Sequence, residues 1–320
     1  MFFTDGKVSR DFLLNGSFNY AHPDYPLLVP LSVAWLYTCL GRVNDQLAKV
    51  IYPLQYLSLL MVFHYMAEKA SSRRNASLFT ALLALTPIVT IHAGGLPSRD
   101  FVGYADLTLS IYFAGAGGFF YLYIVAEDRF FLIISALFLG MGAWTKNEGL
   151  VFALIGGGLA GAYLLRKKRT PEILTAACIL VILAAPWLVY KVYLNITSEY
   201  AGNMKIAAVR SNINRLPFIL AGMKYNMFGN IALYNFTWYG YALTSLMNWR
   251  GFFRNRLIFL HAMLFLQFGA YIFVYIISPS DINWQISTSL DRLILHMVPF
   301  ALLIAAINTG ILSAGCCEKT

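Results

Sequence analysis

The sequence predicts an all-α integral membrane protein, a polytopic helical bundle of about nine spans with an interfacial helix near the N-terminus. Hydrophobic residues make up 59% of the 320 residues and charged residues only 12%. The mean hydropathy of +0.62 lies far outside the range of soluble proteins. Long apolar runs alternate with short polar breaks from residue 50 onward, and 24 Phe and 20 Tyr are typical of aromatic belts at both membrane interfaces.

The predicted spans are apolar stretches that can cross about 30 Å of hydrocarbon. They are 50–66, 76–93, 104–125, 130–145, 149–165, 173–194, 226–247, 257–277 and 291–313. The spans 130–145 and 149–165 are short and joined by a turn at Lys146–Glu148, so we expect a tight helical hairpin there.

The basic residues indicate how the spans are oriented. Half of the 24 Lys and Arg residues lie in the loops after alternate spans and at the C-terminus, and the positive-inside rule places these segments in the cytoplasm. They are Lys69, Arg73, Arg74, Arg129, Arg166, Lys167, Lys168, Arg169, Arg250, Arg254, Arg256 and Lys319. We therefore interpret the basic residues behind the formal charge of +9 as determinants of membrane topology rather than as a nucleic-acid-binding surface. Residues 1–49 are expected outside and the C-terminus inside.

The segment Pro26–Gly41 is apolar but short for a span, and it is interrupted by Pro30. A span here would also reverse the polarity of every later loop, so we expect an interfacial helix on the outer leaflet near 27–40. The expected organisation is an extracytoplasmic segment 1–49, a transmembrane domain 50–313 and a cytoplasmic tail 314–320. Because 49 residues must cross the membrane with no span before them, we expect that the chain begins downstream of a missing first span.

Conspicuous polar residues converge on the expected extracytoplasmic face. They are His22 and Asp24 before the interfacial helix, Arg99, Asp100 and Asp106 at the third span, Lys146 and Glu148 in the hairpin turn, and Asp281 to Arg292 before the last span. Ionised groups at membrane depth cost about 3 kcal/mol and usually face a polar cavity or a partner. Each residue also has an ordinary explanation alone: a helix-dipole charge for Asp106, interfacial anchors for Lys146, Glu148 and Arg292, and a structural role for His22 and His296.

Together these residues suit transfer from a phosphate-linked donor. Lys146, Arg292 and Arg99 would hold a phosphate, and one of the carboxylates Asp24, Asp106 and Glu148 would deprotonate an acceptor hydroxyl. Asp106 with His22 or Glu148 would bind a divalent metal ion (Mg or Mn) or the acceptor. The sequence has neither a G-x-x-x-x-G-K-[ST] loop nor an H-E-x-x-H motif, which disfavours a nucleotide-driven transporter and a zinc protease.

Four short motifs, in order, resemble the membrane glycosyltransferases of the C superfamily, in particular the protein-mannosyltransferase-like group. They are His22-Pro23-Asp24-Tyr25-Pro26-Leu27-Leu28, Tyr104-Ala105-Asp106-Leu107, Thr145-Lys146-Asn147-Glu148-Gly149, and Ser287-Thr288-Ser289-Leu290-Asp291-Arg292-Leu293 leading to Pro299. Together they run from about residue 15 to 305, nearly the whole chain.

The resemblance implies a multi-pass protein of the bacterial inner (plasma) membrane that transfers a sugar with inversion at the outer face. The donor would be a polyprenyl-phosphate sugar and the acceptor a lipid, a glycan or a protein, often with a divalent metal. The family usually carries an acidic residue just after its first span. That residue has no counterpart here, because the chain starts within what would be that loop.

Other readings of the same residues remain open. A transporter or another non-catalytic polytopic protein would use them as a binding or permeation path. Such a protein is expected to show internal repeats with matched broken spans, and the two halves of this sequence show no repeat. An inactive, truncated paralogue of the enzyme is the third alternative.

Overall fold

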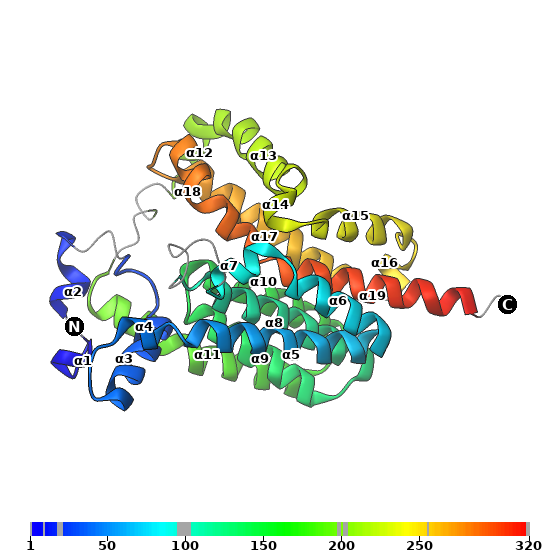
Figure 1. The fold of residues 1–320 in the computed structure, drawn as a ribbon, viewed down its shortest axis with the longest axis horizontal. Coiled ribbons are helices and arrows are strands. Elements are labelled where there is room, and N and C mark those ends of the chain that lie inside the picture. The colour runs from blue at the N-terminus through cyan, green and yellow to red at the C-terminus, as the bar shows by residue number, and fades with distance from the viewer. Residues whose placement is uncertain are drawn as a thin grey trace.

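The computed structural model describes residues 2–8, 10–17, 22–94, 104–196, 200, 204–254 and 256–317, and these residues form a helical bundle with no strand among them (Figure 1). In chain order the α-helices are α1 (Phe2–Asp5), α2 (Arg10–Leu14), α3 (Leu28–Leu40), α4 (Asp45–Ala48), α5 (Ile51–Ala70), α6 (Arg73–Ala84), α7 (Pro87–His92), α8 (Asp106–Ala126), α9 (Arg129–Ala143), α10 (Asn147–Arg166), α11 (Thr170–Tyr193), α12 (Ile206–Asn212), α13 (Leu216–Lys224), α14 (Ile231–Tyr234), α15 (Thr237–Met247), α16 (Gly251–Arg254), α17 (Ile258–Ile277), α18 (Ile282–Leu295) and α19 (Val298–Cys317). A 3-10 turn, Ile213–Arg215, precedes α13, and a π-helical turn, Tyr225–Gly229, follows it.

Several helices are long and apolar enough to cross a membrane, which confirms the prediction of a helical membrane protein. Within the described part of the chain there are 5, namely Asp45–Ala70, Asp106–Ala126, Asn147–Arg166, Thr170–Tyr193 and Ile258–Ile277. The bent pair Ile282–Leu295 and Val298–Ser313 makes up to 6 if its two helices, inclined at 41°, form one span.

The other three expected spans are not long single helices. The stretch 76–93 is divided into α6 and α7 at Pro87, which has no N–H to continue the hydrogen-bond ladder of α6. The stretch 130–145 forms α9, an apolar helix of 15 residues. The stretch 226–247 is divided among the π-helical turn, α14 and α15, with Asn235 in the left-handed region (φ 49°) after α14. Nine continuous spans are therefore absent from the described residues.

Helix α8 is the centre of the bundle. Most of its residues are buried, and it contacts α5, α9, α10, α17 and α19. Glycines allow this close packing, since a Cβ on Gly117 would lie 2.2 Å from the Phe300 ring and one on Gly118 would lie 2.3 Å from Met66 Sδ. On the next face, the Phe113 and Phe152 rings stack with centroids 3.8 Å apart. Helix α8 is consequently held in place by several neighbouring helices.

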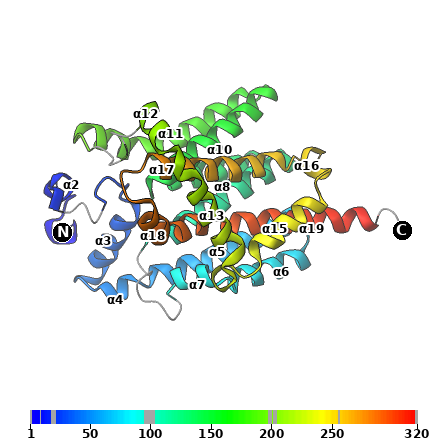
Figure 2. The same ribbon diagram turned by 90° about the horizontal axis from the view of Figure 1, so that it is seen from above.

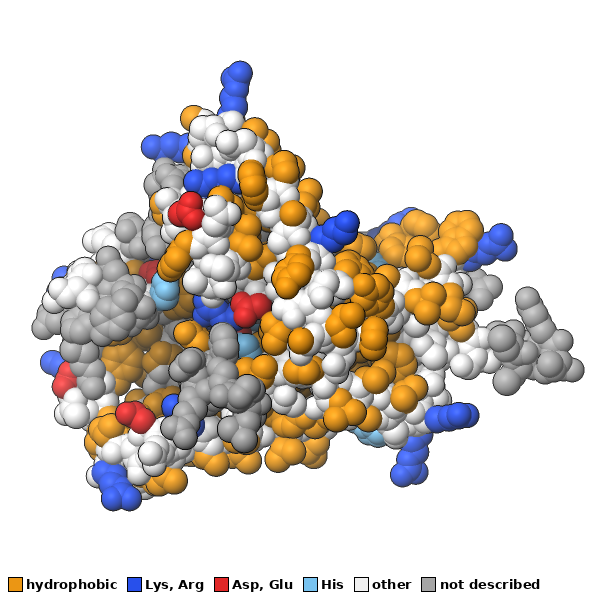
Figure 3. Space-filling view, turned by 45° about the horizontal axis from the view of Figure 1, so that its top comes forward, with side chains coloured by type: hydrophobic (Ala, Val, Ile, Leu, Met, Phe, Trp, Pro, Cys, Tyr) orange, Lys and Arg blue, Asp and Glu red, His pale blue; other side chains and the backbone are white. Residues whose placement is uncertain are grey.

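Most of the long helices run roughly along the long axis, so the bundle has two ends (Figures 1 and 2). One end carries α1–α4 and the N-terminus of α8. The opposite end, which we call the basic end, carries Arg129, Arg166–Arg169 and Arg256. Its loops are joined by the Arg129–Glu172 and Arg169–Glu127 ion pairs at 3.1 and 2.8 Å and by a hydrogen bond from Arg256 to the Ile124 carbonyl. Figure 3 shows hydrophobic side chains over the flank between these ends.

The expected interfacial segment forms α3, with bounds close to the predicted 27–40. Pro30 lies in the first turn, where a helix does not need its missing N–H. Gly41 ends the helix in the left-handed region (φ 66°), and its N–H bonds to the Thr38 carbonyl. The position of α3 in a membrane interface, like the boundaries at residues 49 and 313, stays a prediction.

Candidate functional site

A buried cluster of charged side chains surrounds the carboxylate of Asp106, the first residue of α8. The Asp106 Oδ1 atom accepts hydrogen bonds from Lys146 Nζ and His296 Nε2, both at 2.8 Å. Arg292 Nη1 lies 3.9 Å from the other oxygen, Oδ2. Asp106 also lies at a helix N-terminus, where the backbone dipole favours a negative charge. Two distant parts of the chain, around Lys146 and around Arg292 and His296, thus converge on one carboxylate.

Lys146 is placed by the turn between α9 and α10. It has extended backbone at the N-cap of α10 (φ −153°, ψ 161°). The turn requires glycine at position 149, because a Cβ there would lie 2.0 Å from the Gly142 carbonyl oxygen. Lys146 Nζ also lies 3.4 Å from Glu148 Oε1 and 5.5 Å from the centre of the Tyr25 ring. Lys146 therefore bridges two carboxylates.

The electrostatics keep Lys146 charged. Burial alone lowers the pKa of a lysine, but the carboxylates of Asp106 and Glu148 outweigh it and raise the pKa of Lys146 above its ordinary value. Burial and the nearby Glu148 carboxylate hold the pKa of the Tyr25 hydroxyl well above its ordinary value. At neutral pH the site therefore presents an ammonium group beside a neutral phenol.

The N-terminal segment packs against the same turn. Asp24 Oδ2 accepts a hydrogen bond from Asn147 Nδ2 at 3.1 Å, and the Asp24 carbonyl accepts one from Lys191 Nζ at 3.4 Å. His22 is exposed and stacks on Tyr25 with ring centroids 5.0 Å apart. Asp24 and His22 therefore lie at the rim of the cluster rather than in its buried centre.

Of the residues that the sequence singled out, Asp106, Lys146, Glu148 and Arg292 form the cluster and Asp24 adjoins it. The guanidinium of Arg292 also lies over the Tyr104 ring, 4.6 Å from its centre. Arg99 and Asp100 lie outside the described residues.

Sequence reasoning gave His296 only a structural role and did not name Tyr271, but both are buried members of the site. The Tyr271 hydroxyl lies 2.9 Å from His296 Nδ1, so the chain Tyr271–His296–Asp106 is continuous. A signal was present, because Arg292 and His296 are four residues apart and share a helix face. This signal was overlooked because the residues around His296 are apolar, namely Leu293–Leu295 and Val298–Ala301.

The two residues predicted to bind a metal ion, Asp106 and His22, lie in different surroundings. The described residues contain no group of three or more His, Cys, Asp or Glu side chains that could hold a metal ion. The Oδ1 atom of Asp106 already accepts hydrogen bonds from an ammonium group and an imidazole, whereas His22 is exposed at the rim. Asp106 and His22 as metal ligands stay a prediction, and no step below uses a metal.

Three polar atoms of the cluster are buried and make no hydrogen bond among the described residues. They are Asp106 Oδ2, Glu148 Oε2 and Arg292 Nε. Buried polar atoms are nearly always paired, so unpaired ones in a native structure call for an explanation. Two acceptors and one donor in the same cluster fit a site that binds a polar ligand.

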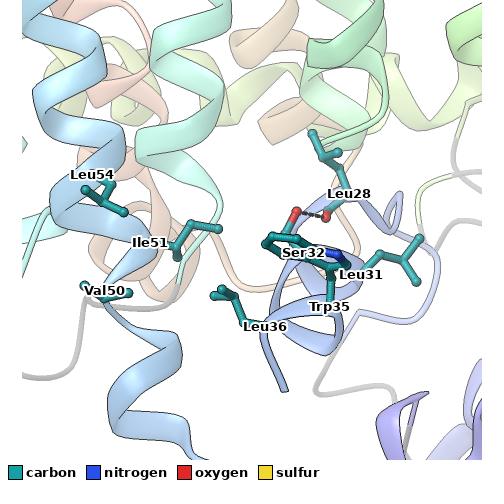
Figure 4. Close-up of a pocket in the computed structure, with 8 residues that line it drawn as sticks. All are labelled: Leu28, Leu31, Ser32, Trp35, Leu36, Val50, Ile51 and Leu54. Carbon is teal, nitrogen blue, oxygen red and sulfur yellow. Dashed lines mark hydrogen bonds between the residues drawn. The ribbon is translucent and has the colours of Figure 1, made fainter. Parts of the chain in front are cut away.

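An apolar groove lies beside the cluster, between α3 and the start of α5 (Figure 4). Its volume is about 450 Å³. It is lined by Leu28, Leu31, Ser32, Trp35, Leu36, Val50, Ile51 and Leu54. The Leu28 N–H bonds to the Trp144 carbonyl at 3.2 Å, two residues before Lys146. One residue of the groove lining is therefore hydrogen-bonded to the α9–α10 turn, which carries Lys146.

These features define a multi-pass helical membrane protein with a buried ionic site at one end of its bundle. Comparison of the chain with protein-family models, with curated proteins and with solved structures finds no match. The function is therefore inferred from the residues of the site.

Proposed function

We propose that the protein is a glycosyltransferase that moves a sugar from a polyprenyl-phosphate donor to an acceptor at the extracytoplasmic face of a bacterial inner membrane. The observation that carries the proposal is the pair of cations, Lys146 and Arg292, held on either side of Asp106 at one end of the bundle. A buried lysine and an arginine on one carboxylate are suited to a phosphate group that gains charge as it leaves.

In this mechanism Lys146 and Arg292 bind the donor phosphate, and Asp106 helps to keep Lys146 charged and holds the two cations close together. Glu148 is the favoured base, because its Oε2 atom is buried without a hydrogen-bond partner among the described residues. Asp106 is less suited to that role, since two N–H donors occupy its Oδ1 atom and the Arg292 guanidinium lies 3.9 Å from its Oδ2 atom. Asp24, at the rim, is the alternative base.

The transfer step is a displacement at the anomeric carbon. Glu148 takes the proton of the acceptor hydroxyl, the acceptor oxygen bonds to the anomeric carbon, and the bond from that carbon to the phosphate oxygen breaks. The polyprenyl phosphate leaves with the electron pair and carries the additional negative charge. As Glu148 becomes neutral, its attraction for Lys146 weakens. The ammonium group can then stabilise the leaving phosphate.

The groove between α3 and α5 supports a lipid-linked donor. Its lining is almost entirely apolar, and Leu28 connects it to the turn that carries Lys146. Burying a CH₂ group contributes about 0.8 kcal/mol, so a few isoprene units would add substantial affinity. In the proposal the first isoprene units lie in the groove and the phosphate points toward Lys146.

The proposed topology has nine crossings, an outside N-terminus and α3 on the outer leaflet. The broken stretches α6–α7 and 225–247, the short helix α9 and the bent pair α18–α19 count as crossings in it. Reporter fusions at Ser72 and Lys168 are expected to report cytoplasm, and a fusion at Asn203 the outside. A periplasmic signal at Lys168 would exclude this topology.

A proton-coupled transporter is the second candidate, favoured by the buried chain Tyr271–His296–Asp106–Lys146–Glu148. Buried carboxylates and histidines of this kind line proton paths in transporters. A transporter would move protons with its substrate and leave the glycosidic bond to phosphate intact.

The test is sugar transfer by the purified chain in proteoliposomes, from a polyprenyl-phosphate sugar to added acceptor. Lys146→Ala is expected to reduce turnover about a hundredfold, as loss of one charge-stabilising donor does in other transfer sites. Lys167→Ala, at the basic end, is the matched control and should transfer at the unmodified rate. Full transfer by a folded Lys146→Ala variant would exclude the proposed site, and substrate-dependent proton movement without transfer would favour the transporter.

A further inference from the structure

Tyr271 and His296 form a buried relay that ends on Asp106. The Tyr271 side chain is 1% exposed and His296 0% exposed. Tyr271 comes from α17, and His296 lies at the bend between α18 and α19. The two hydrogen bonds, 2.9 and 2.8 Å long, use both nitrogen atoms of the imidazole. The imidazole therefore links the Tyr271 hydroxyl to the Asp106 carboxylate.

The chemistry of the three groups fixes where the protons lie. An ionised carboxylate only accepts hydrogen bonds, so His296 Nε2 carries a proton and donates it to Asp106. A neutral imidazole then has an acceptor at Nδ1, which takes the Tyr271 hydroxyl as donor. Both nitrogen atoms of the imidazole therefore have a partner of the right kind, which holds the ring in one tautomer.

We infer that His296 and Tyr271 are positioning residues of the transfer site, an inference that rests on the proposed function. The terminal torsion of an aspartate is soft, so one contact alone would not fix the carboxylate plane. Lys146 and His296 approach Oδ1 from different elements and together direct Oδ2 toward Arg292. The relay thereby sets the spacing of the two cations that would bind the donor phosphate.

The helices α18 and α19 are inclined at 41° to each other next to these residues. Arg292 lies in the last turn of α18, and His296 is the C-cap residue of that helix, at the bend. Both side chains reach Asp106 at the N-terminus of α8.

The same helix α17 provides a matched control at its other end. There the Tyr241 hydroxyl lies 2.8 Å from His261 Nδ1, and both side chains are buried. The His261 ring stacks on Phe252, with centroids 4.4 Å apart. This second Tyr–His pair has nearly the same geometry as the first and lies away from Asp106.

The experiment compares the two pairs in the full chain, reconstituted with a polyprenyl-phosphate sugar as probe. His296→Ala is expected to lower kcat roughly 10–100-fold, the range seen when a residue that orients a site ligand is removed. The KM for donor should change little, because the groove still holds the lipid. His296→Gln keeps an N–H donor and should recover most of kcat, and Tyr271→Phe should show a smaller loss. Tyr241→Phe and His261→Gln should leave kcat unchanged.

A second readout is independent of activity. Thermal unfolding in detergent is measured for His296→Ala, Asp106→Asn and the double variant, and the two changes are expected to be non-additive because the residues share a hydrogen bond. If the unmodified chain transfers sugar while His296→Gln, His296→Ala and Tyr271→Phe match the Tyr241 and His261 controls, the positioning role is wrong. Additive melting shifts would overturn the coupling as well. If the unmodified chain transfers no sugar, the proposed function itself fails, and the positioning role in transfer fails with it.

Discussion

The two ends of the bundle both carry ion pairs, but they differ in how far water is excluded. At the basic end the Arg169 and Glu127 side chains are 45% and 48% exposed. At the other end the Lys146 and Asp106 side chains are only 9% and 1% exposed. Exposed pairs contribute about 0–1 kcal/mol, whereas a buried pair needs partners on every side to offset its desolvation. A costly buried cluster is therefore the better candidate for function, and the basic end for topology.

The largest expected effect is the loss of the central carboxylate. Asp106→Ala would leave Lys146 and Arg292 buried without the negative charge between them, which costs about 3–5 kcal/mol in buried pairs. Unfolding in a detergent titration, read by tryptophan fluorescence, measures this change. If Asp106→Ala were as stable as the unmodified protein, the claimed difference between the buried cluster and the exposed ion pairs would be wrong.

A smaller effect is expected from the turn that places Lys146. Gly149→Ala drives a Cβ to within 2.0 Å of the Gly142 carbonyl oxygen. The hairpin must open slightly, at a cost of about 1–3 kcal/mol. Gly158→Ala, on the same helix, is the control because an added Cβ there meets nothing within 4 Å. Equal melting temperatures for the two variants would show that the turn tolerates the side chain.

The groove provides the third prediction. Ser32 lines it, and its hydroxyl bonds to the Leu28 carbonyl. Ser32→Phe fills the groove and is expected to raise the KM for a long-chain donor roughly tenfold, the lower end of what a hydrophobic pocket discriminates. Thr38→Phe is the control, since Thr38 makes the same type of bond, to Ala34, on the exposed side of α3. A KM that stays the same for Ser32→Phe would remove the groove from the proposal.

The smallest effect is expected at the basic end. Glu127→Gln removes the charge that pairs with Arg169, in a contact where both side chains are largely solvated. The expected loss of stability is about 0–1 kcal/mol, and it should shrink further as salt is added. A loss comparable to that of Asp106→Ala, measured in the same titration, would contradict the distinction between the two ends.

The helices themselves were largely predictable from the sequence. Apolar runs of about 20 residues identify α8, α10, α11 and α17, and the bounds found for α3 follow those expected for the interfacial segment. The divided stretches were missed for a physical reason. Hydropathy averages over a window, so it does not register one missing N–H at Pro87 or one left-handed residue at Asn235.

The sequence alone determined that this chain forms apolar helices, which residues could carry charge, and which loops are basic, because these properties depend on composition and local spacing. Only the tertiary structure decided that His296 bonds to Asp106 across 190 residues of chain and that Tyr271 lies behind it. Such contacts depend on how α8, α17 and the α18–α19 bend pack against each other. The apolar sequence neighbours of a histidine do not show whether it contacts lipid, the protein core or a carboxylate. The partner of His296 is therefore determined by helix packing.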